Sequence, residues 1–347
     1  TSQCLAVVKA NAYGHGIRSV CQRLQGLVDY FGVASIDEAL AIRQVDQTTP
    51  IVLMEGVFQA SEYTLAQAHR CQVVTHCPEQ IAWLNDYPKE QAPLTAWLKI
   101  DTGMGRLGFA PSEALDVLET LKQHRSIGPT IPIMTHLACA ENINHTLNRK
   151  QRNVLDIILA QLPDCSSHPL SLCNSAAILT YPNDHGAIIR PGLNLYGASN
   201  TSDSLALKPV MTLKSRLISV KTLPKGHCVG YGGHFICPER MPVGQVAMGY
   251  GDGYPRHISR GTPVRIHGIL CPIIGQISMD MLSVDLRPCF NARVGDWVTL
   301  WGDDLPIETI ATASGRSPSD LLCSVMHRVQ FDWQDTLPVT TMTDKTP

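Results

Sequence analysis

The 347-residue sequence lacks the patterns that mark several classes of protein. No apolar run approaches the roughly 18 residues that a membrane-spanning helix needs. There is no block of like charges and the net charge is only −2, so neither nucleic acid nor a membrane is an expected partner. The composition, 44% hydrophobic and 17% charged, is that of an ordinary soluble globular protein.

Twelve cysteines are present, but no two of them have Cys-x-x-Cys spacing. Several, such as Cys71 and Cys173, lie inside apolar runs that are typical of strands. Metal-knuckle spacing is absent, and nothing marks a disulfide framework in a chain of this size. We therefore expect reduced, buried thiols in a cytoplasmic enzyme, with no metal site.

Short apolar runs recur up to residue 204 and alternate with amphipathic stretches. Eight buried strands separated by helices predict an α/β protein with a parallel (β/α)8 barrel of the TIM type. A doubly wound sheet is the alternative, but no Gly-x-Gly-x-x-Gly motif follows the first strand, which disfavours it. The predicted strands are Cys4–Lys9, Tyr30–Ala34, Ile51–Met54, Cys71–Thr75, Ala96–Ile100, Ile131–His136, Leu170–Cys173 and Ala187–Ile189. The predicted helices include Ile17–Leu27, Ile36–Gln44, Pro111–His124 and Thr146–Gln161.

The pattern changes after about Ala206, where β-rich runs are separated by Gly, Pro and Asp. This predicts a second, mostly antiparallel β domain that ends in a short helix near Ser319–Met326. The polar segment Asn200–Leu205 is the expected linker, so the predicted domains are residues 1–204 and 205–347. The predicted β runs are Val210–Val220, Gln245–Gly249, Pro263–His267, Pro272–Ile277, Leu282–Leu286 and Trp297–Trp301.

The first predicted strand places Lys9 where it stops, and Gly14 and Gly16 then bend the backbone away. Burying a lysine is costly unless it is neutralised or used covalently. Two interpretations are open at this point. Lys9 is either a snorkelling lysine at a strand end or a lysine that forms a Schiff base.

Other predicted strand ends carry polar groups as well, and the carboxyl ends of barrel strands are where barrel enzymes do their chemistry. Each group has a structural explanation of its own. Asn174 with Ser175 suits a helix N-cap, His136 a satisfied core histidine, and Arg190 a structural ion pair. Their occurrence on one rim is what favours a site. The residues at these ends are Lys99, His136, Asn174, Ser175, Arg190 and Gly192.

This rim holds the groups that a pyridoxal phosphate site needs. Lys9 would bind the aldehyde as a Schiff base. Asn174 and Ser175 can donate to phosphate oxygens, at the strands where barrels often hold a phosphate. Gly192 with Leu193 can add bare backbone N–H groups.

Five segments resemble, in the same order, the motifs of the alanine racemases, and the resemblance covers nearly the whole chain. The segment Ala6–Gly16 is similar to the cofactor-attachment signature of that family. The other similar segments are Lys99–Gly108, Arg190–Gly197, Gly249–Arg256 and Met279–Asp280.

The resemblance implies a role for each matching residue. Lys9 would hold pyridoxal phosphate and act as acid or base on one face of the substrate. Tyr250 would be the base on the other face, contributed by the partner subunit of a homodimer. Arg190 would face the pyridine nitrogen, and His136 would lie against the ring.

The remaining roles that the resemblance implies concern the phosphate and the substrate. Arg106 would contact the cofactor phenolate and the substrate carboxylate, and Met279 would border the substrate. Lys99 matches a lysine that is carbamylated in many members of the family. The phosphate would be bound by Tyr13, Ser175, Gly192 and Leu193 together with Asn174.

Together these residues imply an alanine racemase that interconverts L- and D-alanine by a two-base mechanism, through the Schiff base of cofactor and substrate. It would supply D-alanine for peptidoglycan or degrade it. The alternatives are an amino acid racemase of broader specificity and a pyridoxal phosphate decarboxylase of the same architecture. Decarboxylases pair the pyridine nitrogen with an acid, so Arg190 disfavours them. A non-catalytic cofactor-binding protein would have no need of a β domain that carries Tyr250.

The sequence departs from the family pattern in three places. The strand and helix that precede the lysine in the family are missing, and we expect a trimmed start rather than a shorter enzyme. Ser319 stands where we match a family tyrosine beside the phosphate, so we expect measurable serine activity from a pocket that lacks an aromatic wall. Gln276 replaces a family arginine, a change that the sequence does not explain.

Overall fold

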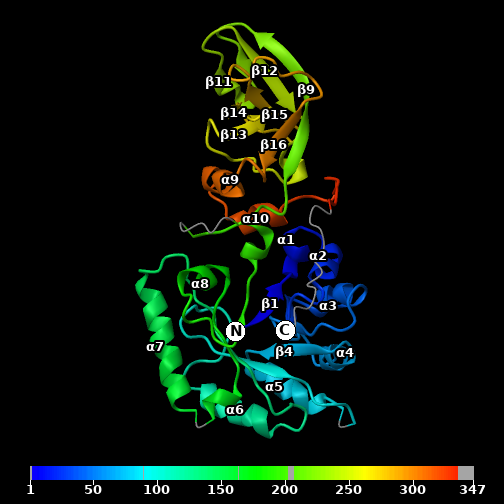
Figure 1. Cartoon of the computed structure of the whole chain (residues 1–347), viewed down its shortest axis with the longest axis vertical. Coiled ribbons are helices and arrows are strands. Elements are labelled where there is room, and N and C mark those ends of the chain that lie inside the picture. The colour runs from blue at the N-terminus through cyan, green and yellow to red at the C-terminus, as the bar shows by residue number, and fades with distance from the viewer. Residues whose placement is uncertain (1, 89, 163, 202–206, 335–347) are drawn as a thin grey trace, which may run out of the picture.

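The computed structural model describes residues 2–88, 90–162, 164–201 and 207–334. A parallel barrel forms one end of the molecule and an antiparallel β domain the other, with two short helices between them (Figure 1). The predicted boundary between residues 204 and 205 lies outside the described residues. Among the described residues, no helix combines the length and the apolar character that crossing a bilayer requires.

Eight short strands form the first barrel, and each pairs in parallel with the next strand along the chain up to β7. β1 also pairs with β8, and a hydrogen bond from Arg190 N to Cys173 O (2.9 Å) joins the ends of β8 and β7, which closes the ring. The predicted (β/α)8 barrel is therefore confirmed. The strands are β1 (Gln3–Val7), β2 (Tyr30–Val33), β3 (Ile51–Leu53), β4 (Cys71–Thr75), β5 (Ala96–Lys99), β6 (Ile133–Met134), β7 (Leu170–Ser171) and β8 (Ile188–Ile189).

The outer helices follow from apolar residues repeated at helical spacing. In α6, for example, Ala114, Leu118 and Leu121 are buried and share one face. All four predicted helices are present, and each is shorter than predicted. The short α4 and α5 were not among the predictions, and α8 begins at the helix N-cap that the sequence offered at Asn174. The helices are α2 (Ile17–Leu24), α3 (Ile36–Arg43), α4 (Glu62–Ala68), α5 (Pro78–Trp83), α6 (Ala114–Gln123), α7 (Thr146–Ala160) and α8 (Ser175–Thr180).

The first strand differs from its prediction, because it ends at Val7 and Lys9 lies beyond it. Lys9 begins α1 (Lys9–Tyr13), whose last four residues have φ between 51° and 55° and form a left-handed turn. Residues with a side chain adopt this conformation at a cost of about 1–2 kcal/mol each. The Glu38 carboxylate accepts hydrogen bonds from Ala10 N (2.6 Å) and Ala34 N (2.8 Å), which holds the start of the turn.

The second domain is a closed antiparallel barrel with the strand order β12-β15-β14-β13-β16-β9, and β10 and β11 form a small hairpin beside it. β12 ends at Val246, earlier than predicted, because the chain enters the short 3-10 turn η5 (Tyr250–Asp252) soon afterwards. The strands are β9 (Leu213–Leu223), β10 (Cys228–Val229), β11 (Phe235–Ile236), β12 (Met241–Val246), β13 (Pro263–Ile266), β14 (Ile269–Ile274), β15 (Leu282–Asp285) and β16 (Trp297–Trp301).

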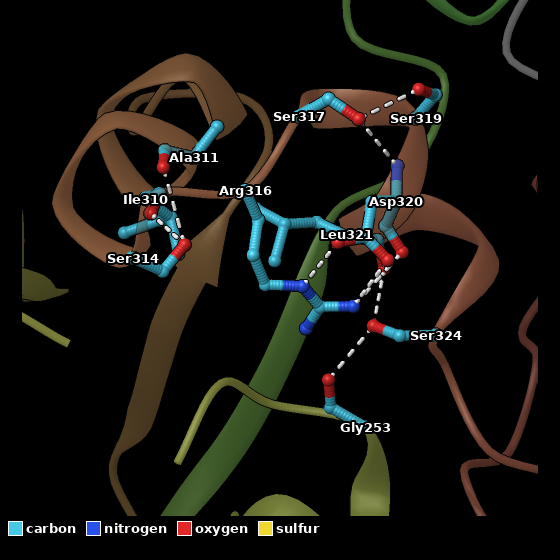
Figure 2. A network of polar contacts seen from close by, with 10 residues as sticks. All are labelled: Gly253, Ile310, Ala311, Ser314, Arg316, Ser317, Ser319, Asp320, Leu321 and Ser324. Atoms are coloured by element: carbon cyan, nitrogen blue, oxygen red, sulfur yellow. Dashed lines mark hydrogen bonds and ion pairs between the residues drawn. The ribbon is translucent and has the colours of Figure 1, made fainter. Parts of the chain in front are cut away.

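The chain finally returns to the first barrel through α9 (Ile307–Ser314) and α10 (Pro318–Cys323), at the predicted place of the last helix. Figure 2 shows how α10 is held: Ser317 Oγ accepts from Asp320 N (3.2 Å), and Ser324 Oγ donates to Gly253 O (2.8 Å) in the β domain. α10 also packs against α1, where a Cβ on Gly14 would lie only 2.2 Å from Leu322 O. The last helix therefore contacts both domains.

Candidate active site

Lys9 lies at the mouth of the barrel, two residues beyond the end of β1. Its side chain is half-buried, and Lys9 Nζ is 3.6 Å from Glu55 Oε1. A snorkelling lysine would direct its amine to solvent, whereas this amine faces a carboxylate on the loop after β3. The geometry therefore favours a lysine that has a task at the mouth.

Three of the predicted phosphate-binding residues come together beside this lysine. The Gly192 N–H donates to Ser175 Oγ (2.8 Å), and a Cβ added to Gly192 would lie 2.7 Å from Tyr13 Oη. The Tyr13 ring stacks on Tyr196, with ring centroids 4.9 Å apart. Leu193 follows Gly192 and begins the turn η3 (Leu193–Tyr196). Glycine is needed here because any side chain would displace the tyrosine hydroxyl.

Asn174 has the structural role that the sequence left open, as the N-cap of α8. Its Oδ1 accepts from Ala177 N (3.0 Å), which satisfies one of the free N–H groups at the start of the helix. Its Nδ2 lies 3.2 Å from His136 Nε2, so the amide also borders the site.

Arg190 is buried at the centre of the barrel mouth and forms no ion pair among the described residues, so its interpretation as an ion-pair residue is wrong. Its Nη1 donates to Ser171 Oγ (2.7 Å) and its Nη2 to Thr135 O (2.7 Å). Burial lowers the pKa of Arg190 to about 10, so the guanidinium keeps its charge at neutral pH. Its Nε is buried and has no hydrogen-bond partner in the described part of the chain.

His136 lies against this guanidinium. Its Nδ1 is 3.2 Å from Arg190 Nη2, and since arginine can only donate, the histidine nitrogen accepts. Burial, followed by the charges of Arg190 and Arg106, holds the pKa of His136 well below its ordinary value. The imidazole is therefore neutral at pH 7 and orients the arginine.

Lys99 ends β5 on the other side of the mouth and is buried. Burial, together with the charges of Arg190 and Arg106, lowers the pKa of Lys99 to about 8. Arg106 is exposed on the following loop, which Asp101 shapes by accepting the N–H groups of residues 103, 104 and 105. Lys99 and Arg106 line one small cavity with His136.

Tyr250 and Met279 lie side by side in the β domain, where Gly251 N donates to Met279 O (2.8 Å) and Tyr250 N to Ser278 O (3.1 Å). Their side chains are 37% and 53% exposed, and the Arg256 guanidinium is 5.4 Å from the Tyr250 ring centroid. In the described part of the chain, no hydrogen bond or ion pair joins either residue to the barrel mouth.

The sequence analysis missed a second exposed tyrosine in the same region. Tyr231 is 71% exposed on the turn η4 (Tyr231–Gly233), between two glycines with φ of 74° and 70°. A Cβ on Gly230 would lie 3.4 Å from Gln276 N, so Tyr231 and Tyr250 flank the segment Gln276–Met279 from its two ends. The sequence pattern that indicates this exposed turn is a tyrosine between glycines, Gly-Tyr-Gly-Gly, directly after a β run.

The arrangement suits pyridoxal phosphate on two observations. The unpartnered Arg190 Nε offers a donor to a ring nitrogen, and the hydroxyls of Tyr13 and Ser175 converge where only glycine fits. Four cationic side chains gather at the mouth, which favours an anionic ligand. They are Lys9, Lys99, Arg106 and Arg190.

Comparison with known proteins identifies the family. Residues 1–200 match the family model "Alanine racemase, N-terminal domain", and residues 210–333 match "Alanine racemase, C-terminal domain". The alanine racemase of Coxiella burnetii is 42% identical over 335 residues, which cover 94% of this chain and 90% of that protein.

Two solved structures show the same similarity. The biosynthetic alanine racemase of Pseudomonas aeruginosa has a TM-score of 0.89 at 41% identity, over 94% of this chain and 91% of that one. The alanine racemase of Bartonella henselae with covalently bound pyridoxal phosphate has a TM-score of 0.84 at 30% identity, over 94% and 91% of the chains. The chain therefore belongs to the alanine racemase family of isomerases.

Proposed function

We propose that the chain is a cytoplasmic, pyridoxal phosphate-dependent racemase that interconverts L- and D-alanine with one base on each face of the substrate. The observation that carries this proposal is the barrel mouth, where a lysine, an arginine with a free Nε and a glycine cradle meet. D-alanine for peptidoglycan, or its degradation, is the corresponding role. The structure shows eleven of the twelve cysteines as free thiols, which fits a reducing compartment.

Pyridoxal phosphate supplies the electron-withdrawing ring that makes the α-proton of an amino acid removable. Tyr13, Ser175 and the backbone at Gly192 and Leu193 would bind its phosphate, with Asn174 supporting them through the start of α8. Arg190 would donate Nε–H to the ring nitrogen and keep that proton, which distinguishes this site from one built around an acid. The decarboxylase alternative is therefore disfavoured.

Lys9 would bear the cofactor and move the proton on one face of the substrate, and a tyrosine of the partner subunit would serve the other face. Tyr250, the residue that the family resemblance implies, has a cation beside its ring. Tyr231 is the second candidate, and its greater exposure favours it for reaching another chain. In D2O, the variant that loses the base should still exchange the α-proton of one enantiomer while racemisation falls by about 10²–10⁴-fold. We expect that outcome for Tyr231→Phe and a smaller loss for Tyr250→Phe.

Arg106 would orient the substrate carboxylate, with Met279 of the partner bordering the same pocket. Lys99 lies close enough to Arg106 to line one cavity with it, and a carbamate on Lys99 would hold the guanidinium by an ion pair. Carbon dioxide reacts with the neutral amine of a lysine. Because the pKa of Lys99 is lowered, part of its amine is neutral at physiological pH.

The proposal also includes a secondary activity of the racemase on serine. Ser319 lies on α10 with its Oγ 2.9 Å from Ser317 Oγ (Figure 2), so it brings no aromatic wall to the site. Replacement by tyrosine should lower kcat/KM for serine relative to alanine, by up to the roughly 10–200-fold that one pocket group decides. An unchanged ratio in Ser319→Tyr would refute this specificity hypothesis.

The deciding experiment is steady-state racemisation of alanine, serine and lysine in both directions, combined with the visible absorbance of the purified protein. We expect alanine to be the best substrate and the Schiff-base absorbance band to disappear in Lys9→Ala. Release of carbon dioxide without racemisation would identify a decarboxylase, and an absorbance band without any turnover would identify a binding protein.

A further inference from the structure

The carboxylate that meets Lys9 belongs to Glu55, a residue to which no role has been given above. Glu55 lies on the loop that follows β3, and its Oε1 is 3.6 Å from Lys9 Nζ. The side chains of Lys9 and Glu55 are 36% and 40% exposed, and the charges of both act on Lys99 at the end of β5, which places the pair at the mouth of the barrel.

The backbone of this loop is fixed by its neighbours. The buried Gln80 side chain donates to Val57 O (3.1 Å), and His76 Nε2 lies 3.0 Å from Glu55 O. Gly56 has φ of 73°, and a Cβ there would lie 2.3 Å from Gln80 Nε2 and 2.4 Å from Val74 O. The loop thus has little freedom, and Glu55 is presented at a defined place.

The charges around Lys9 explain why a carboxylate is needed there. Lys99, Arg106 and Arg190 are cations that act on one another across the mouth, and His136 is neutral. Asp101, the nearby acid on the loop after β5, is occupied by backbone N–H groups. Beside two arginines, and beside Lys99 while that lysine carries no carbamate, the Lys9 amine is repelled from the seat unless an anion holds it.

We propose that Glu55 is the positioning residue for Lys9, and holds the amine over the cofactor seat whenever the lysine is not attached to the cofactor. This state occurs before the cofactor is bound and again in each turnover, after the substrate amine has replaced the lysine. The inference rests on the proposed racemase function and adds a residue to it. Glu55 acts through Lys9 and does not touch the reacting carbon.

The test compares Glu55→Gln, which keeps the size and removes the charge, with Glu55→Asp, which keeps the charge. Glu79→Gln, at an exposed glutamate in the first turn of α5, is the matched control. Pyridoxal phosphate is added to the apoenzyme, and the rise of the Schiff-base absorbance gives the attachment rate. We expect Glu55→Gln to slow attachment and to lower kcat by about tenfold to a hundredfold, with the KM for alanine unchanged. Glu55→Asp should recover part of both rates.

A second comparison separates positioning from a direct effect on the cofactor. In the Lys9→Ala background, Glu55→Gln should leave the affinity for pyridoxal phosphate unchanged, because the lysine through which it acts is gone. The inference is overturned if Glu55→Gln attaches the cofactor at the wild-type rate. It is also overturned if Glu55→Gln lowers the affinity for pyridoxal phosphate in the Lys9→Ala background. A wild-type protein that neither binds the cofactor nor racemises alanine would instead overturn the proposed function.

Discussion

At the scale of single residues, Arg190 organises the site more than Lys9 does. It is buried without a carboxylate, and its Nη atoms are satisfied by a serine hydroxyl, two carbonyls and a neutral histidine. This leaves the buried Nε–H without a hydrogen-bond partner in the described part of the chain. The position of Arg190 at a strand end was predictable from the sequence. The hydrogen-bond network of Arg190 was not predictable, because its acceptors come from the ends of two other strands, β6 and β7.

The first prediction concerns the proton that Arg190 keeps. In Arg190→Glu, an acid in its place would protonate the ring nitrogen and make the bound cofactor a stronger electron sink. The ratio of transamination to racemisation should then rise, measured as pyruvate formed per alanine racemised. Arg190→Gln is the control, since it removes the guanidinium without adding an acid. An unchanged ratio in the glutamate variant would contradict this assignment.

The second prediction concerns Lys99, whose pKa of about 8 leaves a minor neutral fraction at pH 7 and a major one at pH 9. Because only the neutral amine takes up carbon dioxide, carbamate should increase as the pH rises through 8. The measurement is ¹³C NMR in labelled bicarbonate, with Lys99→Ala as the control that lacks the signal. A carbamate signal that does not change between pH 7 and pH 9 would show that the lowered pKa has no part in it.

At the scale of elements, alternating apolar runs predict all eight strands of the first barrel, because burial on both faces leaves a clear pattern. The left-handed turn after β1 was not predictable in this way. Ala10, Ala12 and Tyr13 give no signal for positive φ, which sequence patterns associate with glycine. Contacts far along the chain, such as Glu38 with Ala10 N, impose the turn. Backbone strain of this kind clusters at functional sites, and Tyr13, the last residue of the turn, places its hydroxyl against Gly192.

The third prediction tests that strain. Ala10 is exposed with φ of 53°, so replacement by glycine relieves a backbone strain of about 1–2 kcal/mol. The greater conformational entropy of glycine in the unfolded chain offsets part of this gain. Ala10→Gly should leave the free energy of unfolding unchanged or raise it by up to ~1 kcal/mol, whereas Ala10→Val should lower it. At Ala82, an exposed residue within a helix, replacement by glycine should instead lower the free energy of unfolding by ~1 kcal/mol. Urea unfolding of the apoenzyme measures all three variants, and equal losses at both alanines would contradict the argument.

At the scale of the whole molecule, no hydrogen bond or ion pair among the described residues joins the exposed tyrosines, Tyr231 and Tyr250, to the barrel mouth. A two-fold symmetric dimer can bring the β domain of each subunit to the barrel of the other. The two domains were predictable from the change in sequence pattern near residue 206. Which tyrosine serves the second face was not, because exposure and approach to a partner are properties of the folded surface.

The fourth prediction follows from this arrangement. Lys9→Ala and the base-deficient tyrosine variant should each be inactive alone. When they are mixed and allowed to exchange subunits, half of the dimers are hybrids with one intact site of two, so activity should return to about a quarter of wild type. A variant of the other tyrosine, which is not the base, should be active before it is mixed with Lys9→Ala. Its activity alone therefore shows which of the two tyrosines is the base. No recovery in either mixture would show that the site is completed within one chain.

The close approach of Gly14 to Leu322 has a consequence for exchanging parts between relatives. α10 lies far along the chain from α1, yet it packs on the turn that carries Lys9 and Tyr13 and is anchored to Gly253 through Ser324. A chimaera joined near residue 206 would therefore bring a foreign helix onto the lysine turn. A chimaera that keeps residues 317–324 with their own barrel would preserve this packing. The cost of that design falls on the other side of the helix, where Ser324 would lose its native partner Gly253 in the β domain.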